Sequence, residues 1–175
     1  MDVTINDLSS MRRMRSRYHA FFVVSAARYR HRAEVLAGIC YRETRGGESK
    51  LLDVPGPHGL GDFGHGHGLM QIDDRSHPAF CHSDLWFDAA RNIDQAAAIL
   101  ESVRAQVTKE IAQFSIIATP DQIEQCTIAG YNCGADPAVH ALHHSEGLDT
   151  YTTGKDYSAA VLAYAAAYKS LEDRP

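Results

Sequence analysis

Residues 39–47 read ICYRETRGG and residues 59–73 read GLGDFGHGHGLMQID, and these two stretches decide the fold. The first ends an apolar helical pattern at Gly46 and Gly47, because glycine readily takes the left-handed conformation that closes a helix. The second belongs to a segment, 52–68, that holds six glycines and two prolines. Such a composition is incompatible with a helix and predicts short strands and loops. We therefore expect a small irregular β region inserted after a helix.

The rest of the chain has the patterns of α-helices. One helix is predicted over about residues 7–30 and a second over about 32–44, where Leu36, Ile39 and Cys40 recur at helical spacing. A long helix is expected after a cap at Asp88, and one apolar stripe should be buried along it. The members of this stripe step by three and four: Ile93, Ala97, Leu100, Val103, Val107, Ile111 and Phe114.

Two further helix starts are marked by a capping residue followed by proline, at Thr119-Pro120 and at Asp136-Pro137. A polar loop over residues 143–155 precedes a last helix over about 156–171. These elements predict a mainly α fold, a helical domain with a small β region.

Length and composition set the class of protein. A chain of 175 residues that is 45% hydrophobic suits one globular domain over residues 1–175. The longest early apolar run, 20–27, is too short to span a bilayer. It also lies too far into the chain, behind four arginines, to be an ordinary signal peptide. Four cysteines without a CxxC pair are expected to be free thiols.

Charge is distributed unevenly along the chain. Residues 1–45 carry nine arginines against four acids, whereas the net charge of the whole chain is −5. A basic end could steer the protein toward an anionic polymer, but a solvated helix face is the favoured explanation for any single arginine.

Glu43 is the first candidate for chemistry. It lies seven residues after Leu36 and four after Ile39, and therefore on the same helical face as these apolar residues. Desolvation and the negative end of the helix dipole should both raise its pKa, as a general acid requires. The alternative is a glutamate at the rim of the helix that pairs with Arg42 or Arg45.

Asp62 and Asp73 bracket the glycine-rich loop that follows. Alone, Asp62 could simply make an Asx turn, and Asp73 with Asp74 could form a solvated acidic edge. Together with Glu43 they supply the protonated and ionised carboxyl groups that cleavage of a glycosidic bond needs.

Other chemistry is disfavoured by the same residues. His58, His65 and His67 share the loop, and a His-x-His pair can bind zinc, but no further ligand stands at a fixed spacing. We therefore expect no metal. The loop lacks the Lys-Ser/Thr end of a phosphate-binding loop, and no other cofactor is expected.

Four segments of the sequence together resemble a known protein family. Glu43, with GDFGHGHGLMQIDDRSHP (61–78), AGYNCGA (129–135) and KDYSAAVLAYAAAYK (155–169), resembles the goose-type lysozyme family over roughly residues 12–170. The resemblance implies a lysozyme-like fold, α+β but mainly α, with a β-hairpin region beside an active-site cleft. It also implies a bacteriolytic, antimicrobial peptidoglycan muramidase that hydrolyses the β-1,4 bond between N-acetylmuramic acid and N-acetylglucosamine.

The resemblance also implies roles for single residues. Glu43 matches the catalytic acid of the family, and Asp62 and Asp73 match two aspartates that position the attacking water of an inverting reaction. Positions that match the substrate-binding residues of the family are Gly68, Leu69, Met70, Gln71, His77, Tyr131, Asn132 and Tyr157. The chain departs from the family in its cysteines and in a longer loop with Pro55 and Pro57, which leaves the distance from Glu43 to Asp62 open.

Two other functions share these features. A lytic transglycosylase would use the same acid but would release 1,6-anhydro sugars, and a non-catalytic peptidoglycan-binding module would need none of the three carboxylates. The expected partners are peptidoglycan or N-acetylglucosamine oligomers and a proteinaceous lysozyme inhibitor. We expect no nucleic acid partner, no membrane span and a monomer that acts on the cell wall, extracellularly or in the periplasm.

Overall fold

The computed structural model describes residues 2–50 and 59–171, so that Pro55, Pro57 and His58 lie outside the described residues. The chain divides into two compact units within helix α4, Ala89–Gln113, and again within helix α7, Tyr157–Ser170. One unit holds residues 2–97 and the segment that begins at residue 163, and we call it the sheet-containing unit. The other holds residues 98–162, and we call it the all-helical unit.

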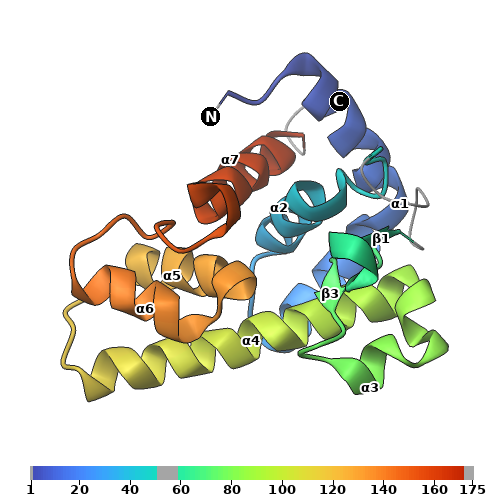
Figure 1. The fold of residues 1–175 in the computed structure, drawn as a ribbon. Coiled ribbons are helices and arrows are strands. Elements are labelled where there is room, and N and C mark those ends of the chain that lie inside the picture. Colours follow the sequence, from blue (N-terminus) through green and yellow to red (C-terminus); the bar gives the residue numbers. More distant parts are fainter. Residues whose placement is uncertain (1, 51–58, 172–175) are drawn as a thin grey trace. The chain divides into compact units, whose positions relative to one another are not determined.

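The sheet-containing unit begins with two helices that pack on each other, α1 (Ile5–Tyr29) and α2 (Ala33–Thr44), which Figure 1 shows in blue and teal. Three short strands then form an antiparallel sheet in the order β1-β2-β3. The elements that complete this region are β1 (Leu60–Gly61), the 3-10 turn η1 (Asp62–Gly64), β2 (Gly66–His67), β3 (Ile72–Asp73), α3 (Pro78–Cys81) and η2 (Asp84–Phe87). The predicted mainly α fold with a small β region is confirmed.

The all-helical unit contains α5 (Pro120–Cys133), α6 (Ala135–His143) and the 3-10 turn η3 (Thr153–Lys155). Thr119 caps α5 as predicted, in a capping box with Gln122. A core of small and branched side chains joins these helices to α4: Val107, Ile111, Cys126, Ala129, Ala135, Ala138 and Val139.

Three local predictions were wrong. The residue that ends α2 in the left-handed conformation is Arg45, with φ 53°, one position before the glycines. Asp136 lies inside the first turn of α6, whose cap is Gly134. Phe114 is 49% exposed because α4 ends at Gln113, so the buried stripe stops at Ile111.

All four cysteines are free thiols, as expected, and all four belong to the described residues. Burial raises the pKa of the Cys40 thiol to about 12, so this group is no nucleophile near neutral pH. Among the described residues, no helix is both long enough and apolar enough to cross a membrane.

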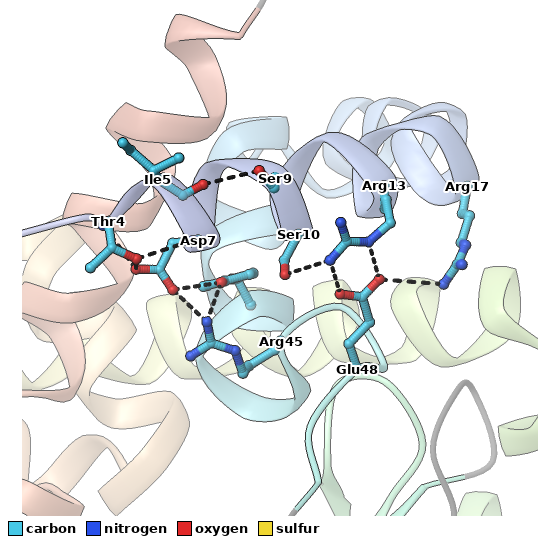
Figure 2. A network of polar contacts seen from close by, with 10 residues as sticks. Thr4, Ile5, Asp7, Ser9, Ser10, Arg13, Arg17, Arg45 and Glu48 are labelled. Atoms are coloured by element: carbon cyan, nitrogen blue, oxygen red, sulfur yellow. Dashed lines mark hydrogen bonds and ion pairs between the residues drawn. The ribbon is translucent and has the colours of Figure 1, made fainter.

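The carboxylate of Asp7 ties the start of α1 to the end of α2 (Figure 2). Its Oδ2 accepts hydrogen bonds from the backbone and hydroxyl of Thr4, at 2.9 and 2.6 Å. Its Oδ1 accepts from the hydroxyl of Tyr41 at 2.7 Å and from Arg45 at 2.5 Å. Burial works to raise the pKa of Asp7, but these hydrogen bonds outweigh it and lower the pKa to about 2. Asp7 therefore stabilises the fold as a carboxylate.

We predict that Asp7→Asn lowers the free energy of unfolding by about 2 kcal/mol at neutral pH, because an amide cannot accept from all four donors. The carboxylate contributes stability above about pH 4, and this contribution is lost as the pH falls toward the native pKa. Urea unfolding should therefore show a gap between wild type and variant that closes in acid. Asp2→Asn, an exposed control near the same terminus, should leave stability unchanged. A pH-independent gap would contradict this account of Asp7.

Candidate active site

The site is built around a buried turn, residues 68–71, that joins β2 to β3. The strands pair Gly66 with Asp73 and His67 with Ile72, which brings Asp73 back beside the glycine-rich loop. The turn closes with a hydrogen bond from the backbone of Gln71 to the carbonyl of Gly68 at 3.2 Å, and the side chain of Gln71 donates to the same carbonyl at 2.8 Å. Gln71 takes a left-handed conformation, with φ 47°.

Asn92, in the first turn of helix α4, hydrogen-bonds to the backbone of the segment around residues 68–71. Its side-chain oxygen accepts from the backbone of Met70 at 2.9 Å, and its side-chain nitrogen donates to the carbonyl of His67 at 3.1 Å. Asn92, Leu69 and Met70 are completely buried. A buried backbone group without a partner is costly, and the side-chain amide of Asn92 gives a partner to the backbone N–H of Met70 and to the carbonyl of His67.

Thr44 connects the same turn to the helix that carries Glu43. Its hydroxyl donates to the carbonyl of Leu69 at 2.9 Å and accepts from the backbone of Gly47 at 3.0 Å. Glu43, the preceding residue, lies in the last turn of α2 and is partly buried. The predicted apolar face is broader than expected, because every residue from 35 to 41 of α2 is buried. Arg45, one proposed rim partner of Glu43, binds Asp7.

Arg75 brings the two candidate aspartates together. Its guanidinium contacts both oxygens of Asp73 through Nε, at 3.0 and 3.1 Å, and its Nη2 lies 2.5 Å from Oδ2 of Asp73. The same Nη2 lies 2.7 Å from Oδ2 of Asp62. Hydrogen bonds from Arg75 are the main reason why the pKa of Asp73 is lowered. Both aspartates therefore belong to one cluster of charges.

Asp62 and its neighbour Phe63 both have left-handed backbones, with φ 49° and 57°. Such conformations cost energy for residues other than glycine. Asp62 and Phe63 are both exposed, and Phe63 is completely so. The 3-10 turn thus presents the Asp62 carboxylate at the surface of the loop, where Arg75 reaches it.

The histidines occupy different positions around this cluster. His77 precedes α3, and burial lowers its pKa while the nearby charge of Asp73 offsets part of that effect. Nδ1 of His65 lies 2.9 Å from Oδ1 of Asp74. Asp74 therefore has a side-chain partner and does not simply form part of a solvated acidic edge. In residues 2–50 and 59–171, no group of three His, Cys, Asp or Glu side chains could hold a metal ion.

Three candidate residues lie in the all-helical unit. The side chain of Asn132, near the end of α5, accepts from the backbone of Thr153 at 2.8 Å and so holds the η3 turn. Tyr131 is partly buried, and Tyr157, at the start of α7, is only 2% exposed. Asp149 caps that helix, since its carboxylate accepts from the backbones of Ser158 and Ala159 at 2.7 and 3.0 Å.

Sequence reasoning missed the residues that hold the site together: Thr44, Arg75 and Asn92. Only Arg75 carries a local signal, because it stands two residues after Asp73 and can fold back onto it. Thr44 and Asn92 lie 25 and 22 residues from their partners Leu69 and Met70. No periodic pattern reports such contacts.

The mainly α-helical architecture with a small three-stranded sheet agrees with the lysozyme-like fold that the sequence resemblance implies. A family model described as Lysozyme g matches residues 3–171. The chain belongs to the lysozyme g family.

Relatives from birds and fish agree with this assignment. Lysozyme G of Dromaius novaehollandiae is 32% identical over 135 residues, 77% of this chain and 57% of that protein. Lysozyme g of Casuarius casuarius is 34% identical over 77% of this chain and 63% of that protein. Lysozyme g of Takifugu rubripes is 33% identical over 78% of this chain and 65% of that protein. The chain thus spans less than two thirds of the length of these relatives.

Two glycines with left-handed backbones test the account of the turn. At Gly68, with φ 74°, an added Cβ would lie 2.4 Å from the side-chain nitrogen of Asn92, whereas at Gly64, with φ 93°, it would meet nothing within 4 Å. We predict that Gly64→Ala costs about 1 kcal/mol in the free energy of unfolding, the cost of the backbone conformation alone. Gly68→Ala should cost about 3 kcal/mol, because overpacking is added. Equal losses in urea unfolding would contradict the close contact with Asn92.

Proposed function

We propose that this protein is a peptidoglycan muramidase that hydrolyses the β-1,4 bond between N-acetylmuramic acid and N-acetylglucosamine with inversion. Membership of the lysozyme g family supports the class of reaction. The observation that carries the assignment of residues is the hydrogen bond from Thr44 to Leu69, which connects the helix end bearing Glu43 to the turn between the loop of Asp62 and the strand of Asp73.

In this mechanism Glu43 is the general acid. It gives its proton to the glycosidic oxygen as the bond from that oxygen to the anomeric carbon breaks. A water molecule attacks the anomeric carbon from the opposite face of the sugar, and Asp62 and Asp73 hold this water and take its proton. An inverting enzyme separates its acid and base carboxyl groups by roughly 6.5–9.5 Å, which leaves room for the water.

Two kinds of residue are proposed to bind the sugar chain. His77 is near Asp73, and it is proposed to contact the substrate with its imidazole. The turn of Gly68, Leu69, Met70 and Gln71 buries the side chains of Leu69 and Met70, so its proposed contacts are made by the backbone. Tyr131, Asn132 and Tyr157 are assigned to sugar binding by the family resemblance.

The proposed biological setting follows from the substrate. The chain would work as a single catalytic domain and as a monomer, on cell wall outside the cytoplasmic membrane. A proteinaceous lysozyme inhibitor is its proposed protein partner. No step of the proposed mechanism draws on a metal or an organic cofactor.

We predict that Glu43→Gln lowers the rate of lysis of bacterial cells by at least about 100-fold, because a general acid contributes roughly 10²–10⁴ in rate. A turbidity assay measures the rate, and circular dichroism checks the fold. Glu34→Gln is the matched control, since it makes the same change in the first turn of α2. Substantial lysis by Glu43→Gln would refute Glu43 as the acid. A failure of the wild type to lyse cells would instead favour a binding module.

Mass spectrometry of digested peptidoglycan tests the use of water. Hydrolysis should yield reducing muramic acid ends that carry one added water, because Asp62 and Asp73 are proposed to activate that water. In H₂¹⁸O the label should appear at this end. Products lighter by one water, without label, would identify a lytic transglycosylase and would overturn the proposed roles of both aspartates.

A further inference from the structure

Arg75 is exposed and yet is held by two acidic residues. Its side chain keeps 57% of its surface in solvent, while its Nη2 lies within hydrogen-bond distance of both Asp62 and Asp73. The backbone of Arg75 also donates to Oδ1 of Asp73 at 2.7 Å. Asp73 thus meets Arg75 through both of its oxygens, whereas Asp62 meets it through Oδ2. One guanidinium therefore fixes the positions of two carboxylates.

This arrangement solves an electrostatic problem. Two carboxylates that approach one another disfavour each other's charge, and one of them tends to take up a proton. A protonated carboxyl cannot accept the proton of an attacking water. A guanidinium keeps its charge at every relevant pH and presents several donors in a rigid planar fork, so it can serve both carboxylates at once. A lysine ammonium supplies the charge without the fork.

We propose that Arg75 is a positioning residue of the active site, which joins Asp62 and Asp73 into one unit and supplies the positive charge that both carboxylates need. This inference rests on the proposed function, in which the two aspartates activate water. It assigns Arg75 no contact with the substrate. Arg75 acts through the aspartates, and its loss should change the titration of Asp73.

Other charged groups near the pair do not replace Arg75. Asp74, His77 and Cys81 interact electrostatically with Asp73. Asp74 adds negative charge, but it is bound by His65. Burial lowers the pKa of His77 and raises the pKa of Cys81 to about 11, so both groups are neutral near pH 7. Among the described residues that interact with Asp73, the group that carries a positive charge near neutral pH is therefore Arg75.

Because Arg75 is exposed, its substitution is expected to change the active site without unfolding the protein. Ion pairs at the surface contribute little to stability, so variants of Arg75 should fold, which thermal unfolding checks. The variants are Arg75→Gln, which removes the charge, and Arg75→Lys, which keeps it. Arg91→Gln is the matched control, because Arg91 is an exposed arginine in the same unit.

The first measurement is a titration of the side-chain carboxyl carbons of Asp62 and Asp73 by ¹³C NMR, in the absence of substrate. Arg75→Gln should raise the titration midpoint of Asp73 by about one pH unit or more, since an adjacent opposite charge shifts a carboxyl by 1–3 units. Arg75→Lys should recover part of this shift, and Arg91→Gln should match the wild type. Unchanged midpoints in Arg75→Gln would overturn the proposal.

The second measurement is the pH dependence of kcat/KM for solubilised peptidoglycan. The acidic limb reports the base, so a raised aspartate pKa should move this limb of Arg75→Gln to higher pH, with partial rescue by Arg75→Lys. A shifted titration with an unmoved acidic limb would refute the positioning role. If the wild type cleaves no peptidoglycan, the proposed function fails, and the NMR titration alone then decides whether Arg75 controls the aspartates.

Discussion

The structure of the site depends on the hydrogen bonds of one buried turn. Residues 68–71 reverse the chain between strands of only two residues each, which cannot satisfy the backbone of the turn. The backbone of Gly68 donates to the carbonyl of Gly59 at 2.8 Å, and Asn92 and Thr44 satisfy Met70 and Leu69. Because buried polar groups need partners, this small set of contacts fixes the sheet against both α2 and α4.

That constraint holds the helix end that carries Glu43 and the strand that carries Asp73 to the same turn. Glu43 stands one residue before Thr44, and Asp73 closes the strand that leaves the turn. The end of α2 is fixed a second time, because Tyr41 and Arg45 both bind Asp7 of α1. These contacts fix the backbone of the helix end that carries Glu43. Such support is what a preorganised catalytic group requires.

The surroundings of the three carboxyl groups differ in kind. Glu43 lies partly buried in the last turn of α2, and the proposed acid role supposes that burial and the helix dipole disfavour its negative charge. Asp62 and Asp73 both contact the guanidinium of Arg75, and its hydrogen bonds lower the pKa of Asp73. Pairs of carboxyl groups with opposed surroundings are the usual basis of acid and base roles at one pH.

Much of this could be predicted from local patterns. Thr119-Pro120 identified the start of α5 and Asp88 capped α4, because capping depends on residues a few positions apart. The glycine-rich stretch predicted a small β region, because its local composition excludes a helix. The cap at Arg45 escaped prediction, since it is its contact with Asp7, 38 residues away, that favours this arginine at the position.

The candidate site was predicted as a set of residue types, but not as a structure. The motifs named Glu43, Asp62 and Asp73. The spacing of Asp73 and Arg75 allows their contact, but nothing in it showed that Arg75 also reaches Asp62, 13 residues away, or that Asn92 binds the turn. Both facts depend on side-chain contacts between segments, which periodicity does not encode.

The stereochemistry of the first product tests the central claim most directly. Proton NMR can follow the anomeric signals of an N-acetylglucosamine oligomer during rapid cleavage, before the sugar ends interconvert. If Glu43 acts as acid and water held by Asp62 and Asp73 attacks from the opposite face, the α-anomer appears first. Initial formation of the β-anomer would mean retention, and would contradict the proposed arrangement of acid and water on opposite faces of the bond.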